Sequence, residues 1–183
     1  LLTSTLLWAR LDNAYIWMGL FVMMSFGLIG FADDYAKIAK QNSLGVPGKI
    51  RLLLGLVIAG VAAVWAATYH PDALQNQLAL PVFKDTLLNL GMLFVPFTMI
   101  VIVGSANAVN LTDGLDGLAI VPAMIVAGCL ALITYIVGNQ VFSSYLQVYN
   151  FPGAGELTVF CGALVGASLG FLWFNAPPAM VFM

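Results

Sequence analysis

The sequence carries very little charge. Of its 183 residues only 8% are charged, whereas 62% are hydrophobic, and the mean hydropathy is +1.00. An ordinary soluble domain has about a quarter of its residues charged, so the composition argues against that class. We therefore expect an integral membrane protein or a piece of one.

Histidine and cysteine are also scarce. The chain has one histidine, His70, and two cysteines, Cys129 and Cys161. The cysteines do not have the spacing of zinc ligands, and nothing in their positions suggests a disulfide framework. Both fall inside apolar runs, so we expect free thiols that pack as small apolar residues, and we interpret His70 as a solvated loop residue.

The apolar runs show no alternation of period two, which argues against a β-barrel. A run of about 18 or more apolar residues is long enough to cross a bilayer as a helix. The sequence contains five such runs, at about 14–32, 50–69, 86–104, 117–138 and 156–174. The predicted fold is therefore all-α, a polytopic transmembrane helix bundle with about five spans.

The two ends of the chain suggest that it is the middle of a longer protein. It begins at Leu1 rather than at Met, and it stops at Met183 within an apolar stretch. We expect residues 1–183 to be a single transmembrane domain, an internal fragment of a longer membrane enzyme.

The few basic residues are unevenly placed. Four of the six lie between the first two predicted spans, namely Lys37, Lys40, Lys49 and Arg51. The positive-inside rule puts this segment, 33–50, in the cytoplasm. Alternation of the spans then gathers four carboxylates on the cytoplasmic side, those of Asp33, Asp34, Asp113 and Asp116.

An acidic pair ends the first predicted span. If the helix continues past the membrane surface, Asp33 and Lys37 are i,i+4 partners, and Asp34 and Lys37 are i,i+3 partners. A carboxylate next to hydrocarbon is costly, and it marks a functional site by default. The plainer alternative is a solvated acidic pair with a compensating lysine.

The segment 105–117 follows the third predicted span and is rich in polar groups. It contains two Asp-Gly steps, which favour turns because glycine accepts positive φ. A simple connector would account for the turns, but not for polar residues that recur every three positions and share one face of a helical stretch. These residues are Asn107, Asn110, Asp113 and Asp116.

Two segments are predicted to lie outside the cell. We expect a short hairpin within 70–85, between Pro71 and Pro81, and an interfacial aromatic belt within 139–155. At the other face, Asn175 and the two prolines that follow end the last span. Asn175 belongs with the acids only through the predicted topology.

Carboxylates with nearby cations suit a magnesium-dependent reaction on a phosphate. Mg²⁺ prefers oxygen ligands, often one or two carboxylates together with water and substrate phosphates. Lys and Arg neutralise the remaining charge. The residues alone thus indicate metal-assisted phosphoryl chemistry between a soluble and a lipid substrate, without naming either one.

Three stretches resemble the polyprenyl-phosphate N-acetylhexosamine-1-phosphate transferases. They are Gly30-Phe31-Ala32-Asp33-Asp34-Tyr35-Ala36-Lys37, the stretch from Asn107 to Ala119, and the stretch from Phe171 to Met183. The resemblance extends over nearly the whole chain. It is nearest to the branch that acts in bacterial cell-wall synthesis.

This resemblance implies transfer of phospho-MurNAc-pentapeptide from UDP-MurNAc-pentapeptide to undecaprenyl phosphate, giving lipid I and UMP. It implies Mg²⁺ as the cofactor, the bacterial inner membrane as the location, a cytoplasmic active face and a homodimer. We expect no nucleic-acid partner.

The resemblance also assigns roles by motif position. The acidic pair Asp33 and Asp34 would be metal ligands or the catalytic base. Further catalytic residues would be Lys37, Lys49, Asp113 and Asp116. The nucleotide-sugar site would be lined by Asn107, Asn110, Leu115, Asp116, Asn175 and Phe182, with Phe182 stacking on the uracil.

Some family features are missing, and two other functions stay open. The next acidic motif, Gly-Asp-x-Gly-Ser, would follow Met183, so we expect the fragment alone to be inactive. A sister enzyme that transfers N-acetylglucosamine-1-phosphate would use the same acids. An ion-coupled transporter would need its acids deep within broken helices.

Overall fold

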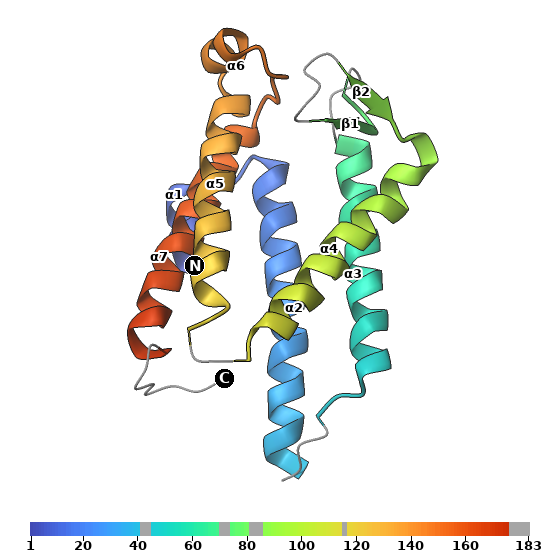
Figure 1. The fold of residues 1–183 in the computed structure, drawn as a ribbon, viewed down its shortest axis with the longest axis vertical. Coiled ribbons are helices and arrows are strands. Elements are labelled where there is room, and N and C mark those ends of the chain that lie inside the picture. The colour runs from blue at the N-terminus through green and yellow to red at the C-terminus, as the bar shows by residue number, and fades with distance from the viewer. Residues whose placement is uncertain (41–44, 70–73, 81–85, 115–116, 176–183) are drawn as a thin grey trace. The chain divides into compact units, whose positions relative to one another are not determined.

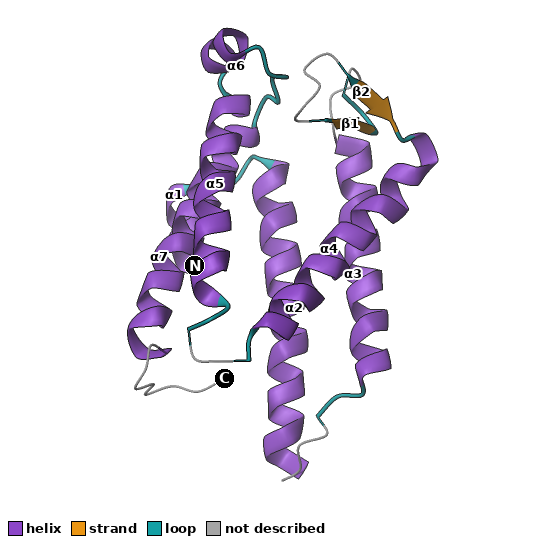
Figure 2. Ribbon diagram, viewed as in Figure 1, coloured by secondary structure: helices purple, strands orange, loops and turns teal. Residues whose placement is uncertain are grey.

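The computed structural model describes residues 1–40, 45–69, 74–80, 86–114 and 117–175, and most of these are helical (Figures 1 and 2). The order of elements is α1 (Leu2–Trp8), α2 (Ala14–Lys40), α3 (Gly48–Tyr69), β1 (Gln77–Ala79), β2 (Leu87–Asn89), η1 (Gly91–Leu93), α4 (Phe94–Thr112), α5 (Ile120–Gly138), α6 (Gln140–Leu146), η2 (Ala154–Glu156) and α7 (Leu157–Asn175). The prediction of an all-α fold is confirmed, with two three-residue strands as the only sheet in the described residues.

Five helices are long and apolar enough to cross a membrane, as predicted. These candidate spans are Ala14–Ala39, Gly48–Tyr69, Gly91–Thr112, Ile120–Gly138 and Ala154–Asn175. Many of their large apolar side chains are exposed, including Ile100 and Leu132. Such faces are expected on helices whose solvent is lipid rather than water.

Helix α2 is longer than the bilayer core requires. Its 27 residues rise about 1.5 Å each and so extend for about 40 Å, against about 30 Å of hydrocarbon. The predicted span ended at residue 32, whereas the helix continues to Lys40. Its last two turns, which carry the acidic pair, therefore have room to stand beyond the hydrocarbon.

The chain forms two compact units, of which one comprises residues 18–105 and is called here the middle unit. In it, α2, α3 and α4 pack through small residues of α3. A Cβ on Gly55 would contact Phe26 of α2 and Val103 of α4, and a Cβ on Gly60 would contact Met99 of α4. The small residues of α3 thus leave room for side chains of α2 and α4.

The middle unit also contains the predicted hairpin. Strands β1 and β2 pair antiparallel, with Leu78 opposite Leu88, and Gln75 donates a 2.7 Å hydrogen bond to the Ala67 carbonyl of α3. The second strand lies after the predicted range, within the stretch assigned to the third span. The predicted start of that span at 86 is therefore wrong, because an apolar strand looks like a span by hydropathy alone.

The other compact unit, called here the terminal unit, comprises residues 1–17 and 106–183. Figure 1 shows α5 and α7 side by side within it. The hydroxyls of Thr134 and Thr158 lie 3.2 Å apart across this pair. Near the end of α5, a Cβ on Gly138 would overlap the backbone of Gly155, so the missing side chain of Gly138 permits this close approach.

The predicted external segment 139–155 contains α6. Asn139 caps this helix, because its side-chain oxygen accepts hydrogen bonds from the backbone N–H groups of Val141 and Phe142. Tyr145 is exposed. Cys129 and Cys161 are free thiols, as predicted.

Candidate functional site

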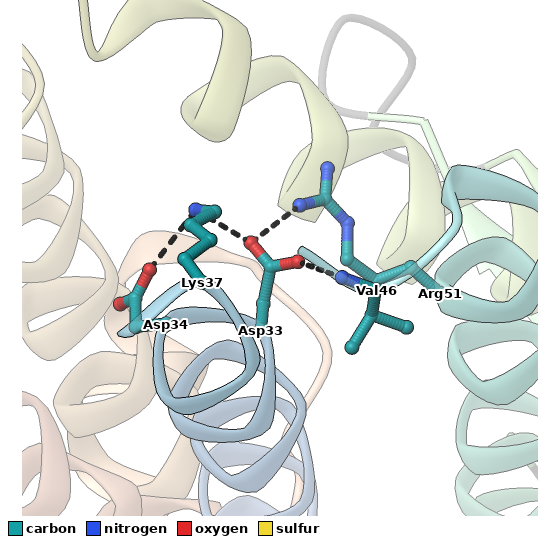
Figure 3. A network of polar contacts seen from close by, with 5 residues as sticks. All are labelled: Asp33, Asp34, Lys37, Val46 and Arg51. Carbon is teal, nitrogen blue, oxygen red and sulfur yellow. Dashed lines mark hydrogen bonds and ion pairs between the residues drawn. The ribbon is translucent and has the colours of Figure 1, made fainter. Parts of the chain in front are cut away.

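A network of charges joins the end of α2 to the start of α3 (Figure 3). Asp33 is at its centre and is only 6% exposed. One carboxylate oxygen of Asp33, Oδ1, accepts a 2.8 Å hydrogen bond from the Val46 N–H. The other, Oδ2, lies 2.8 Å from Nζ of Lys37 and 3.4 Å from Nη1 of Arg51.

Asp34 is the exposed member of the acidic pair. Its side chain is 74% exposed, and its Oδ1 lies 3.0 Å from Nζ of Lys37. The ammonium of Lys37 therefore bridges both carboxylates, as the i,i+4 and i,i+3 spacings predicted. The network confirms that α2 continues as a helix through these residues.

Gly45 allows the chain to pass close to Asp33. It is buried and has φ +51°, and a Cβ built on it would lie 2.5 Å from Oδ1 of Asp33. A side chain would be strained at this φ and would displace the carboxylate. Glycine is therefore required at this position by both backbone conformation and space.

The basic residues at the start of α3 differ in placement. Pro47 begins the first turn by accepting hydrogen bonds from Ile50 and Arg51 through its carbonyl. Lys49 is exposed, whereas Arg51 is partly buried and faces Asp33. Sequence reasoning selected Lys49 for the site and treated Arg51 only as nearby charge. Spacing along the chain gave no signal for the Asp33–Arg51 pair, which depends on how the connection folds back.

A second group of predicted residues lies at the end of α4, in the terminal unit. Asn107 and Asn110 are exposed residues of the helix, and Asp113 follows its last turn, with its N–H bonded to the Val109 carbonyl at 3.2 Å. The predicted helical stretch is confirmed for Asn107 and Asn110, whereas Asp113 lies just after the helix, which ends at Thr112. Leu115 and Asp116 lie outside the described residues, as does Phe182.

Asn175 is tied to the connection that follows Asp113. Its Oδ1 accepts a 2.8 Å hydrogen bond from the Gly117 N–H, and the residue is 2% exposed. Gly117 has φ +75°, and a Cβ on it would lie 3.4 Å from Leu172. The amide oxygen of Asn175 thus holds the end of this loop against α7, a contact across 58 positions that no local pattern predicts.

The described residues contain no group of three or more His, Cys, Asp or Glu side chains that could enclose a metal ion. What they offer is an adjacent carboxylate pair next to cations. This donor set suits Mg²⁺ only where substrate phosphates and water complete its coordination. Asp33 and Asp34 are not in a broken helix, since α2 is continuous from Ala14 to Lys40, and the transporter alternative requires its acids in such a helix.

Comparison with known proteins gives one family and several close relatives. The family model "Glycosyl transferase family 4" matches residues 16–183. The chain is 68% identical over its whole length to the phospho-N-acetylmuramoyl-pentapeptide-transferase of Ruegeria sp. (strain TM1040), covering 51% of that protein. It is 57% identical over 180 residues to the protein of the same name from Granulibacter bethesdensis, which is 98% of this chain and 50% of the relative. The chain spans about half the length of the curated relatives it matches.

Proposed function

The chain belongs to glycosyl transferase family 4, and from this premise we propose that it forms part of a phospho-N-acetylmuramoyl-pentapeptide-transferase. The reaction is transfer of phospho-MurNAc-pentapeptide from UDP-MurNAc-pentapeptide to undecaprenyl phosphate, giving lipid I and UMP for peptidoglycan synthesis. The observation that carries the proposal is 68% identity over all 183 residues to a relative of that name.

The reaction needs negative groups and cations at one place. A phosphate oxygen of the lipid attacks the phosphorus that bears the sugar, and the bond from that phosphorus to the bridging oxygen breaks. UMP leaves with the electron pair, and a new diphosphate joins lipid and sugar. Charge builds up on the phosphate oxygens, so stabilisation by positive groups dominates the rate enhancement.

In the proposal, the network at the end of α2 meets the phosphates. Lys37 already lies between two carboxylates, and Lys49 is exposed two residues before Arg51. These cations can re-pair with phosphate oxygens when a substrate arrives. Mg²⁺, held by carboxylates of the Asp33–Asp34 pair, would polarise the diphosphate and offset its charge.

The residues at and after the end of α4 are proposed to bind the nucleotide sugar. The exposed amides of Asn107 and Asn110 and the half-buried carboxylate of Asp113 can hydrogen-bond uracil and sugar hydroxyls. The proposed nucleotide-sugar site consists of Asn107, Asn110, Leu115, Asp116, Asn175 and Phe182. Asp113 and Asp116 are proposed to be catalytic. We further propose that the protein acts at the cytoplasmic face of the bacterial inner membrane, as a homodimer.

A chimera provides the test. In it, this chain replaces the 68% identical segment of the Ruegeria sp. (strain TM1040) relative. With UDP-MurNAc-pentapeptide, undecaprenyl phosphate and Mg²⁺, we expect UMP release at a rate close to that of the unaltered relative, and loss of release in EDTA.

Two results would contradict the proposal. One is a chimera that inserts and unfolds cooperatively but releases no UMP. The other is a chimera that prefers UDP-N-acetylglucosamine when both donors compete, which would support the sister transferase instead. For the 183 residues alone we expect no UMP release, because half of the relatives' length is missing.

A further inference from the structure

The acidic pair at the end of α2 consists of two adjacent residues in different surroundings. Both oxygens of Asp33 have partners from the chain, namely the Val46 N–H on one side and Lys37 with Arg51 on the other. The Asp33 side chain is 8% exposed, whereas that of Asp34 is 74% exposed. The carboxylate with access to a large ligand is that of Asp34.

Two partners of Asp33 are distant from it in sequence and lie at the start of α3. Val46 is 13 positions away and Arg51 is 18 positions away. Oδ1 thus holds the backbone just before α3, and Oδ2 holds a side chain of its first turn. A buried carboxylate with this set of partners braces two helix ends.

Gly45 completes the brace, because it leaves the space that the carboxylate occupies. A Cβ at this position would lie 2.5 Å from Oδ1 and 3.0 Å from Cε of Lys37. By contrast, a Cβ on Gly48, three residues later, would contact nothing within 4 Å. The requirement for glycine is therefore specific to the position facing Asp33.

We infer that Asp33 is a positioning residue, which with Gly45 and Arg51 ties the start of α3 to the end of α2, and that Asp34 is the member of the pair that meets the ligand. The inference rests on the proposed function, because the ligand is the Mg²⁺-bound phosphate of that reaction. The brace keeps Lys37 in place beside Asp34 and sets where α3, and with it Lys49, begins.

The first arm of the test measures thermal unfolding of the chimera in EDTA, without substrates. We expect Asp33→Asn, Gly45→Ala and Arg51→Gln to lower the unfolding midpoint by several degrees, since each disrupts the brace. Asp34→Asn and the matched control Gly48→Ala should leave the midpoint unchanged. Arg51→Lys keeps the charge and should fall between Arg51→Gln and the parent.

The second arm is a double-variant cycle in the same assay. If Arg51 acts through Asp33, then Asp33→Asn combined with Arg51→Gln should unfold at about the midpoint of Asp33→Asn alone. Additive losses would overturn the assignment of Arg51 to the brace.

The third arm measures UMP release against Mg²⁺ concentration. Asp34→Asn should raise the Mg²⁺ concentration for half-maximal rate by about tenfold or more, whereas Asp33→Asn should lower kcat and shift that concentration by less than about twofold. A shift in Asp33→Asn as large as in Asp34→Asn, with an unchanged midpoint in EDTA, would overturn the inference. A parent chimera without activity would refute the proposed function, while the EDTA arms would still decide whether the brace exists.

Discussion

The two groups of candidate residues differ in how their charges are balanced. At the end of α2, two carboxylates share Lys37, and Arg51 adds a second cation to Asp33. In residues 106–183, by contrast, there are three acids, Asp113, Asp116 and Glu156, but no lysine or arginine at all. One group has cations in its own segment, and the other has none there.

This difference suggests that the two groups bind different parts of the substrates. A cluster that holds its own cations can exchange them with incoming phosphate, at the cost of breaking existing ion pairs. A loop with acids and amides but no cations is suited to hydrogen-bonding a neutral sugar or uracil, or to approaching a divalent cation. This comparison supports our proposal that the α2–α3 network binds the phosphates and that the residues at and after the end of α4 bind the nucleotide sugar.

The largest expected effects come from removing one charge in each group. In the chimera, Asp34→Asn and Asp113→Asn should each lower kcat/KM on the order of 10²- to 10³-fold if they act on metal, phosphate or developing charge. The measurement is UMP release under single-turnover conditions. Asp12→Asn, an exposed acid of another segment, is the control and should keep the parent rate. Near-normal turnover in both variants would mean that the assigned sites are wrong in both groups.

The next effect tests the hydrogen bond between Asn175 and Gly117. Asn175→Leu has similar volume but leaves the half-buried Gly117 N–H without its acceptor, and we expect a loss of about 1–3 kcal/mol in the free energy of unfolding. Chemical unfolding of the chimera in detergent measures it. Thr68→Val, which removes an exposed hydroxyl bonded only to carbonyls of its own helix, should cost much less. Equal losses would show that the Asn175 bond has no special role.

A smaller effect is expected between α5 and α7. Here the contact between the helices is made by two neutral hydroxyls, whereas the α2–α3 network is made by charged side chains. Thr134→Val and Thr158→Val each remove one hydroxyl of the 3.2 Å contact. The coupling energy from the double-variant cycle should be about 0.6 kcal/mol, as is typical between membrane helices. A coupling near zero would indicate that packing alone joins this pair.

The smallest effect concerns the exposed pair Arg10–Asp12, with 2.9 Å between Nη2 and Oδ2. The hydrogen bond from the Arg10 guanidinium, and then its charge, hold the pKa of Asp12 below its usual value. A depressed folded-state pKa stabilises the protein above the unfolded pKa of about 3.9, and this contribution is lost as the pH falls through the lower, folded value. In the chimera, the thermal unfolding midpoints of the parent and of Asp12→Asn should therefore differ only slightly from pH 7 to 5. In acid the two midpoints should be equal. A large difference between the two midpoints at pH 7 would mean that an exposed ion pair stabilises this protein as much as the ion pairs of the buried Asp33 carboxylate.

Much of the fold could be predicted because apolar runs of span length have few alternatives to a helix. The errors lie at the boundaries, where hydropathy says least. The first predicted span, α2, was expected to end at residue 32, but the helix continues for eight more residues to Lys40. Charged residues at i,i+4 spacing stabilise this part of the helix, which is no longer apolar. The strand from Leu87 to Asn89 was assigned to a span, because a short apolar run does not reveal its period.

The sequence by itself determined the helices, the pairing of Lys37 with both acids and the shared helix of Asn107 and Asn110, because these features depend on separations of three or four residues along one helix. Only the tertiary structure decided that Asp33 is enclosed by Val46 and Arg51 while Asp34 is exposed, and that Asn175 holds Gly117. Those contacts join residues 13 to 58 positions apart. Their formation depends on where connections between helices turn back, which periodicity and composition do not encode.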